Sequence, residues 1–163
     1  MLFPNHQIMI ASDFGLSFDC AEDGTTFQEN ALQKAFALYE KAKHLNMPIM
    51  ADDSGLIVDA LPGRLGVRTA RFGSKDGQPN LEAHQRNALL LKMMEDKTNR
   101  NACFVCAMVL VQNPYNIYSV VKSTDGKILD SEVGQHGFGY DPVFYCNDAQ
   151  SPMALLSEED KNK

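Results

Sequence analysis

Apolar residues recur at helical spacing in two stretches of the chain, and both stretches predict amphipathic helices. The first runs over 26–44 and begins with Thr26 and Glu29, which have the three-residue spacing of a capping box. The second runs over 80–95, with Asn80 in the capping position. The apolar stripe of the first helix consists of Ala31, Leu32, Ala35, Leu38 and Ala42.

Short apolar runs bounded by turn residues predict the strands of a sheet. They cover 6–11, 48–51, 102–112 and 117–123. Asn113-Pro114 and Asp125-Gly126 are predicted turns, and Ile128 and Leu129 extend the sheet after the second turn. Two helices among several strands, with hairpins in the second half, predict an α/β or α+β domain with a mixed sheet.

The chain has 163 residues and an apolar fraction of 44%, which fits one domain over residues 1–163. Its formal net charge of -6 argues against binding nucleic acid through the phosphate backbone. A nucleotide ligand stays compatible with this charge, because a bound metal reverses the local sign. No apolar run has the length of a membrane span, and the first residues lack the pattern of a signal peptide. We therefore expect a cytoplasmic protein that engages no membrane.

Two adjacent carboxylates, Asp52 and Asp53, follow the predicted strand over 48–51 and precede Ser54-Gly55. At the carboxyl end of a strand they stand where open α/β sheets usually bind ligands. Paired carboxylates suit Mg²⁺, which takes one or two carboxylate oxygens and keeps its other positions for water and substrate phosphates. The same residues also suit an ordinary polar turn. On this segment alone, phosphate chemistry and a turn stay open as alternatives.

A second unusual segment runs from Gly134 to Phe144 and combines three glycines with aromatic residues and Asp141-Pro142. Glycines let a ligand approach the backbone closely. A loop aromatic such as Phe138 can stack on a flat base. The alternative is a hairpin corner whose aromatics cover the core, and taken alone the segment favours that alternative.

Both segments belong to a longer series of motifs that covers nearly the whole chain. The series is Gly24–Ala31 with Lys34-Ala35, Ala51–Leu56 with Val58–Leu61, Ala70–Phe72, Phe104–Cys106, Gly137–Pro142 and Glu159–Asn162. In this order the motifs closely resemble the inosine triphosphate pyrophosphatase family. The resemblance implies an α/β fold with an elongated mixed β-sheet, flanking helices and two lobes around a nucleotide cleft. It also implies a homodimer that uses Mg²⁺ and cleaves inosine, deoxyinosine and xanthosine triphosphates to the monophosphate and pyrophosphate.

The resemblance further implies a role for individual residues. Asp53 would be the catalytic carboxylate that binds Mg²⁺ and helps to activate water. Asp52 and Glu22 would complete the metal-binding set. Substrate contacts are implied for Ser54, Phe138, Gly139, Tyr140, Asp141 and Lys161, with the Phe138 ring stacked on the purine.

Two parts of the family pattern have no counterpart in this sequence. They are the first strand with its Thr/Ser-x-Asn-x-x-Lys phosphate loop, and the Ser-His-Arg and final helix beyond Lys161–Lys163. The expectation is a domain truncated at both ends. The missing loop favours an impaired family member that acts as a nucleotide-binding or dimer-interaction protein, whereas the intact Asp52-Asp53-Ser54 favours the pyrophosphatase. A generic Mg²⁺ phosphohydrolase is a third alternative.

Overall fold

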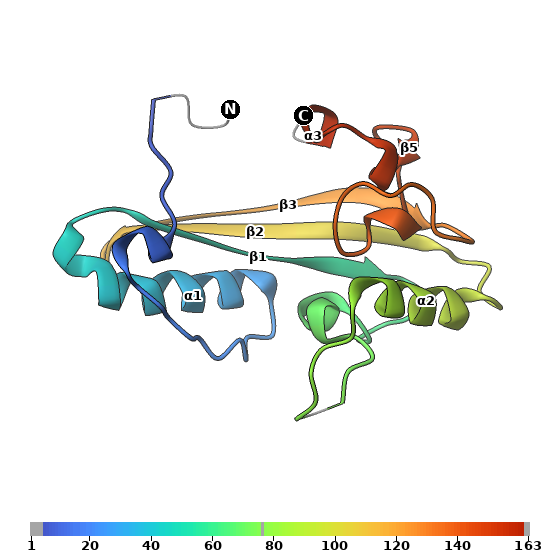
Figure 1. The fold of residues 1–163 in the computed structure, drawn as a ribbon, viewed down its shortest axis with the longest axis horizontal. Coiled ribbons are helices and arrows are strands. Elements are labelled where there is room, and N and C mark those ends of the chain that lie inside the picture. Colours follow the sequence, from blue (N-terminus) through green and yellow to red (C-terminus); the bar gives the residue numbers. More distant parts are fainter. Residues whose placement is uncertain (1–4, 76, 162–163) are drawn as a thin grey trace. The chain divides into compact units, whose positions relative to one another are not determined.

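The computed structural model describes residues 5–75 and 77–161 and combines helices with one sheet (Figure 1). The α-helices are α1 (Phe27–Ala42), α2 (Ala83–Met94) and α3 (Glu158–Lys161). The strands are β1 (Ile49–Val58), β2 (Asn101–Asn113), β3 (Asn116–Ile128), β4 (Phe144–Cys146) and β5 (Ser151–Pro152). Short 3-10 helices cover Ala11–Phe14, Lys43–Leu45, Gly66–Arg71, Asp141–Val143 and Met153–Leu155. In the described ranges, no helix has both the length and the apolar character needed to cross a membrane.

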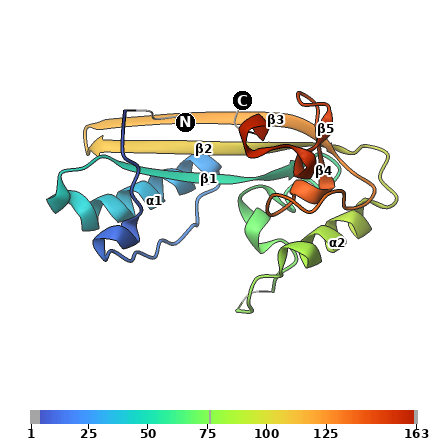
Figure 2. The same cartoon turned by 45° about the horizontal axis from the view of Figure 1, so that its top comes forward.

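The five strands form one open sheet in the order β1-β2-β3-β4-β5. β1 and β2 run in opposite directions (Figure 2), and β3 pairs antiparallel with β4, which pairs antiparallel with β5. The predicted α/β class, with a sheet and flanking helices, is confirmed, and the structure adds that the sheet is open.

The first predicted helix is confirmed, and α1 begins directly after its predicted cap. Thr26 Oγ1 accepts a hydrogen bond from the Glu29 backbone N–H at 3.1 Å, and the Glu29 carboxylate accepts one from the Thr26 N–H, also at 3.1 Å. The second helix is confirmed with a different start, because α2 is capped by Glu82 and not by Asn80. The Ser74 hydroxyl accepts a hydrogen bond from the Leu81 N–H at 3.0 Å, which holds the backbone before Glu82 outside the helix.

Two strand predictions are wrong in position. The segment 6–11 forms no strand; it leads into the 3-10 helix Ala11–Phe14, and its Ile8 and Ile10 side chains are exposed. β1 is longer than the predicted strand 48–51, so Asp52 and Asp53 lie inside the strand and not at its end. The apolar run that predicted 48–51 stops at the polar residues Asp52, Asp53 and Ser54, although β1 continues through them.

The predicted turn at Asp125-Gly126 is also wrong. β3 continues through both residues, and Gly126 lies opposite Cys146 in the register with β4. The pairing with β4 therefore takes the backbone groups that a turn would have used. The predicted turn at Asn113-Pro114 is confirmed, because it separates β2 from β3.

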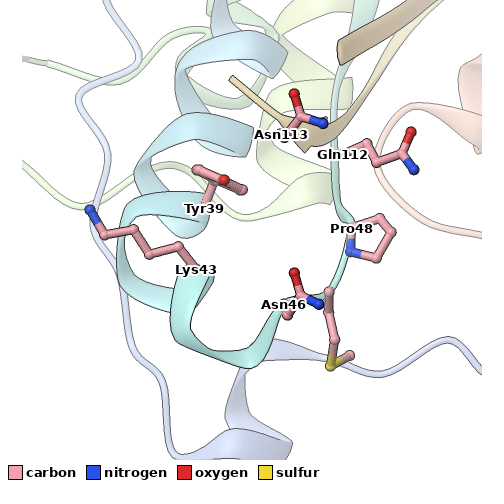
Figure 3. Close-up of a pocket in the computed structure, with 7 residues that line it drawn as sticks. Tyr39, Lys43, Asn46, Pro48, Gln112 and Asn113 are labelled. Atoms are coloured by element: carbon pink, nitrogen blue, oxygen red, sulfur yellow. The ribbon is translucent and has the colours of Figure 1, made fainter. Parts of the chain in front are cut away.

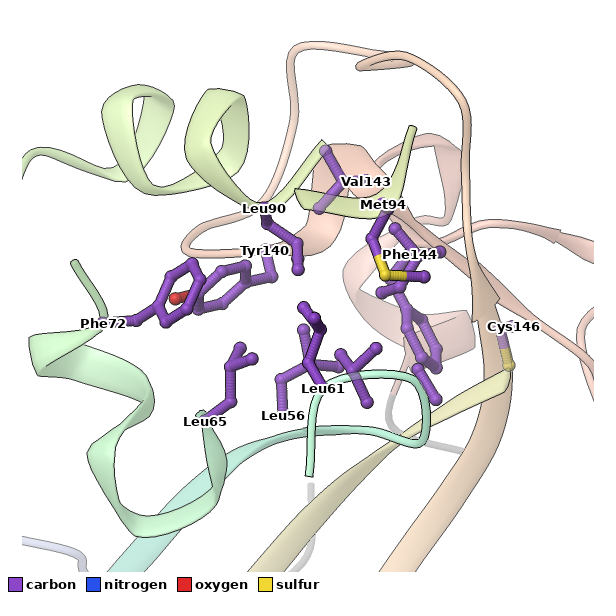
Figure 4. Close-up of a cluster of buried hydrophobic side chains, with 13 residues drawn as sticks. Leu56, Leu61, Leu65, Phe72, Leu90, Met94, Tyr140, Val143, Phe144 and Cys146 are labelled. Carbon is purple, nitrogen blue, oxygen red and sulfur yellow. The ribbon is translucent and has the colours of Figure 1, made fainter. Parts of the chain in front are cut away.

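The chain divides into two compact units. The first unit contains the residues up to Asp53 and those of Ala107–Val120, and in it α1 buries one face that includes Ala31 and Ala35. The second contains Ser54–Cys106 and the residues from Val121 onward. Its core is an apolar cluster that gathers side chains from β1, α2, β2, β3 and β4 (Figure 4). The single domain over residues 1–163 stays a prediction.

Candidate functional site

Asp53, the last residue of the first unit, is a buried carboxylate held by two donors from α1. It is 8% exposed. Its Oδ2 accepts a hydrogen bond from Asn30 Nδ2 at 3.1 Å, and its Oδ1 accepts one from Lys34 Nζ at 2.7 Å. Asn30 and Lys34 are four residues apart, so both project from the same face of the helix. The carboxylate is thus bound separately through each of its oxygens.

Lys34 places a positive charge between two acids. Its ammonium lies 2.7 Å from Asp53 Oδ1 and 3.3 Å from Glu22 Oε1, and it also donates to the Asp52 carbonyl at 3.3 Å. Burial lowers the pKa of Lys34, but the hydrogen bond and charge of Asp53, together with Glu22, outweigh burial and raise that pKa above its ordinary value. Lys34 is therefore charged at neutral pH. We call Glu22, Asn30, Lys34 and Asp53 the acidic cluster.

The loop that carries Glu22 is attached to the same helix. Asn30 Oδ1 accepts a hydrogen bond from the Gly24 N–H at 2.8 Å. A side chain at position 24 would clash, because its Cβ would lie 2.6 Å from Asn30 Oδ1 and 2.8 Å from Glu29 Cβ. Glycine at this position therefore permits the close approach between the loop and α1.

Glu29 caps α1, as its spacing from Thr26 predicts. The Thr25 hydroxyl, followed by the N–H groups of Thr25 and Thr26, donates to the Glu29 carboxylate and lowers its pKa. Its carboxylate accepts hydrogen bonds from Thr25 and Thr26 at the start of α1, so the structure gives this acid a structural role.

The acidic cluster has the chemistry of a cation site. Two carboxylates, those of Glu22 and Asp53, already surround one ammonium ion. Within residues 5–75 and 77–161, no three His, Cys, Asp or Glu side chains gather closely enough to hold a metal, so Asp52 does not complete such a group with the other two. Mg²⁺ commonly binds proteins through only one or two carboxylates and takes water and phosphate oxygens as its other ligands. The residues present therefore fit Mg²⁺.

The second unit contains a large cavity of about 1020 Å³. It brings together the predicted substrate residues of the second unit. Those on its wall are Ser54, Phe138, Gly139, Tyr140, Asp141 and Lys161. Arg86 and Lys122 also line it, together with the apolar Phe104 and Met153, so the wall combines cationic and apolar residues.

The loop 134–141 contains three glycines, and we call it the glycine-rich loop. Its two aromatics have opposite surroundings. Phe138 is 85% exposed, whereas Tyr140 is 3% exposed and belongs to the apolar cluster (Figure 4). The hairpin-corner alternative is therefore correct for Tyr140 and wrong for Phe138. An exposed ring on the wall of a cavity is available to stack on a flat ligand.

Tyr140 fixes this loop to the body of the second unit. Its hydroxyl donates to the Thr69 carbonyl at 2.9 Å, and the Arg86 guanidinium lies 5.8 Å from the centre of its ring. Burial raises the pKa of Tyr140 to about 12, against a smaller opposing effect of Arg86. The buried Asn87 Nδ2 donates to the Gly139 carbonyl at 3.2 Å and holds the same loop from α2.

Asp141 and Lys161 form an ion pair at the cavity wall. Lys161 Nζ lies 2.7 Å from Asp141 Oδ2, which also accepts a hydrogen bond from the Phe138 N–H at 3.1 Å. Gly137 adopts a φ of +91°, and a Cβ there would clash with both partners of the ion pair. Asn162, the last residue of the motif series, lies outside the described residues.

A smaller cavity of about 310 Å³ lies in the first unit (Figure 3). Its wall includes Tyr39, Lys43 and Gln112, and contains none of the predicted site residues. Lys43, which follows the end of α1, is paired with Glu40 of that helix at 2.7 Å.

Sequence reasoning assigned no role to Asn30, Lys34, Thr69 or Arg86. For Asn30 the available signal was a polar residue beside the apolar stripe of α1, and for Lys34 it was the four-residue spacing from Asn30. No sequence pattern pointed to Thr69 or Arg86, because the contacts that join them to Tyr140 span many residues of the chain.

The chain belongs to the Ham1 family, whose model matches residues 2–163. It is similar to the dITP/XTP pyrophosphatase of Treponema denticola, with 40% identity over 161 residues that cover 99% of this chain and 81% of that protein. It is 42% identical to the dITP/XTP pyrophosphatase of Treponema pallidum (strain Nichols), over 99% of this chain but only 58% of that protein.

Solved structures agree with this membership. The Staphylococcus aureus Ham1 protein superposes with a TM-score of 0.83 at 35% identity, and the superposition covers 99% of this chain and 81% of that protein's chain. The nucleoside-triphosphatase / dITP/XTP pyrophosphatase of Mycobacterium abscessus superposes with a TM-score of 0.73 at 34% identity, over 99% of this chain and 82% of that one.

Proposed function

We propose that this chain hydrolyses non-standard purine nucleoside triphosphates, namely the inosine, deoxyinosine and xanthosine forms, to the monophosphate and pyrophosphate. Membership of the Ham1 family supports this proposal, because relatives that are about 40% identical bear the name dITP/XTP pyrophosphatase. The structural observation that carries the proposal is the Asp53 carboxylate bound between Asn30 and Lys34 with Glu22 nearby.

The reaction adds water across one phosphoanhydride bond. The water oxygen bonds to the α-phosphorus, the bond from that phosphorus to the bridging oxygen breaks, and pyrophosphate leaves with the bridging oxygen. A carboxylate near the water can accept its proton, and we assign this role to Asp53. Lys34 carries the positive charge that lies beside Asp53, and we assign it the stabilisation of the charge that develops on phosphate oxygens.

Asp53 and Glu22 would hold Mg²⁺, and Asp52, which does not gather with them into a group of three among the described residues, is left out of the proposed set. When bound, the metal neutralises phosphate charge and orients the phosphate oxygens. Lys34 pairs with both carboxylates, and one ammonium offsets the charge of only one of them. The remaining negative charge attracts a cation, which supports the assignment.

Purine recognition is assigned to the cavity of the second unit. The Phe138 ring, exposed on the cavity wall, would stack on the base, with Gly139 and Tyr140 shaping the loop around it. Lys161, oriented by Asp141, would contact the substrate, and Ser54 on the same wall would donate its hydroxyl. A homodimer in the cytoplasm stays a prediction from the family resemblance.

The test is a phosphate-release assay with dITP, XTP and dATP in the presence of Mg²⁺, run with and without added inorganic pyrophosphatase. Because the proposed product is pyrophosphate, phosphate should be released only when the added enzyme is present. dITP and XTP should turn over faster than dATP, and a chelator should stop the reaction. Release of phosphate without the added enzyme, or equal rates for all three nucleotides, would contradict the proposal.

A further inference from the structure

Asn30 is the uncharged member of the acidic cluster, and it is completely buried at 0% exposure. Its amide uses both ends, since Nδ2 donates to Asp53 Oδ2 at 3.1 Å and Oδ1 accepts from the Gly24 N–H at 2.8 Å. An amide can bind both partners because it carries a donor and an acceptor on one planar group. An Asp of the same size lacks the donor, and an apolar side chain lacks both. Asn30 therefore joins the strand of Asp53 to the loop that carries Glu22.

The two oxygens of Asp53 consequently have different surroundings. Oδ2 is bound by the buried amide, whereas Oδ1 faces the ammonium of Lys34, which is also paired with Glu22. A carboxylate bound through one oxygen cannot rotate freely, so its other oxygen points in a fixed direction. Groups that act on a substrate or a metal need this kind of support from neighbouring hydrogen bonds.

We propose that Asn30 is a positioning residue that orients Asp53 Oδ1 and the Glu22 loop to hold a divalent cation. The inference rests on the proposed function, because it assigns Asn30 a task in the same reaction. Asn30 acts through Asp53 and Gly24. Hydrogen-bond partners of this kind behind metal ligands typically change metal affinity or activity by about 10- to 100-fold when they are removed. The competing explanation is that Asn30 only stabilises the fold.

The experiment compares Asn30→Ala and Asn30→Ser with Gln33→Ala. Gln33 is the matched control because it lies on the same helix and donates to Asp23 Oδ1 at 2.8 Å, in the same loop as Glu22. Three quantities are measured for each purified protein. They are the unfolding midpoint by circular dichroism, the Mn²⁺ affinity of the nucleotide-free protein by electron paramagnetic resonance, and kcat and KM for dITP with Mg²⁺.

We expect folded Asn30→Ala to bind Mn²⁺ about 10- to 100-fold more weakly and to lose a similar factor in kcat, with KM for dITP nearly unchanged. Asn30→Ser keeps a shorter donor and should lose less, and Gln33→Ala should match the parent in both quantities. A folded Asn30→Ala with parental Mn²⁺ affinity and kcat would overturn the proposal and leave Asn30 a structural role. Failure of both Asn30 variants to fold would overturn it in the same way.

The two proposals can fail separately. If the parent protein hydrolyses neither dITP nor XTP, the proposed function fails while the Mn²⁺ comparison still decides the role of Asn30. If the parent hydrolyses dITP but the free protein binds no Mn²⁺, the kinetics of Asn30→Ala decide the role of Asn30. A loss in kcat with KM for dITP nearly unchanged supports the proposal, and a parental kcat overturns it. A parent that neither binds Mn²⁺ nor hydrolyses the nucleotides would overturn both proposals.

Discussion

The acidic cluster of the first unit and the glycine-rich loop of the second achieve order in different ways. In the cluster, Asp53 lies in β1, and Asn30 and Lys34 lie on α1, so regular elements carry the contacts. In the loop, 134–141, three glycines have positive φ and Phe138 is 85% exposed. Only part of the loop is bound to the core, through the buried ring and the hydroxyl of Tyr140 and through the hydrogen bond from Asn87 to the Gly139 carbonyl.

The difference corresponds to the chemistry that we assign to each region. Stabilising charge and moving a proton depend on distances that must be held within a fraction of an ångström. Stacking on a base tolerates small displacements, because a flat ring offers a broad surface. Substitutions in the acidic cluster should therefore act mainly on turnover, and substitutions in the loop should act mainly on affinity.

The strongest test of the comparison is Asp53→Asn. Asn keeps the size of the side chain but loses the charge that holds the metal and accepts a proton. We expect pyrophosphatase activity with dITP to fall by about 10²–10⁴-fold, the usual contribution of a general base. The KM for dITP should change little, and circular dichroism should show an intact fold.

The neighbouring acid provides the control. Asp52 is exposed on β1, so Asp52→Asn makes the same chemical change one residue away. We expect a smaller loss of activity from it than from Asp53→Asn. If Asp53→Asn hydrolyses dITP at the parental rate, the catalytic role of Asp53 is wrong, and the contrast between the two regions loses its basis.

Local signals in the sequence were sufficient for the elements that depend on neighbouring residues. The capping box of Thr26 and Glu29 placed the start of α1 correctly, because its hydrogen bonds join residues three apart. The motif around Asp53 drew attention to a carboxylate that the structure buries between Asn30 and Lys34, and the apolar run over 102–112 predicted β2. In each case the physical cause lies within a few residues of the signal.

Features that depend on distant partners could not be predicted in this way. α2 starts after Glu82 because the Ser74 hydroxyl binds the preceding backbone, and β3 passes through Gly126 because β4 pairs with it. Asn30 acquires its importance from Asp53, which lies 23 residues further along the chain. A polar residue beside the apolar stripe of α1 is a weak signal, and it does not reveal a partner so far along the chain.

Phe138→Ala tests the other side of the comparison. Removing an exposed ring should weaken the binding of inosine nucleotides about 10- to 100-fold, from the loss of about 1–3 kcal/mol of stacking. The unfolding midpoint should stay the same, since the ring makes no contribution to the apolar cluster. Calorimetric titration measures the affinity.

Tyr115→Ala removes an aromatic that is 98% exposed in the first unit and should change neither quantity. An unchanged affinity in Phe138→Ala would exclude stacking.

Two glycines of the loop form a matched pair that sharpens the comparison further. Gly137→Ala places a methyl group against Asp141 and Lys161, whereas the Cβ of Gly139→Ala meets no atom within 4 Å. Both positions have positive φ, so the backbone strain is similar in kind and the clash is the main difference. We expect Gly137→Ala to raise the KM for dITP several-fold more than Gly139→Ala does, with a small effect on kcat. Equal effects would show that the Asp141–Lys161 pair does not contribute to binding.

The smallest expected effect concerns the point where the loop is bound to the core. Below pH 10 the Tyr140 hydroxyl stabilises the folded protein by donating to the Thr69 carbonyl, a hydrogen bond of about 0.5–1.5 kcal/mol net. Burial raises the pKa of Tyr140 to about 12 in the folded protein, against an ordinary value of 10.0. Between these values the unfolded chain loses the proton while the folded protein keeps it. Ionisation therefore favours unfolding, and the contribution of Tyr140 to stability falls as the pH rises from about 10 to about 12.

Urea unfolding of the parent and of Tyr140→Phe at several pH values isolates this contribution from that of the other titrating groups. At pH 8 the parent should be the more stable of the two, and its advantage should shrink above pH 10 because Phe has no proton to lose. Tyr115→Phe, at an exposed position, should follow the parent over the whole range. A constant difference between the parent and Tyr140→Phe would mean that the hydroxyl ionises equally well in both states. The loop would then be held by Asn87 and the packing of the ring, and its order would depend less on hydrogen bonding than that of the acidic cluster does.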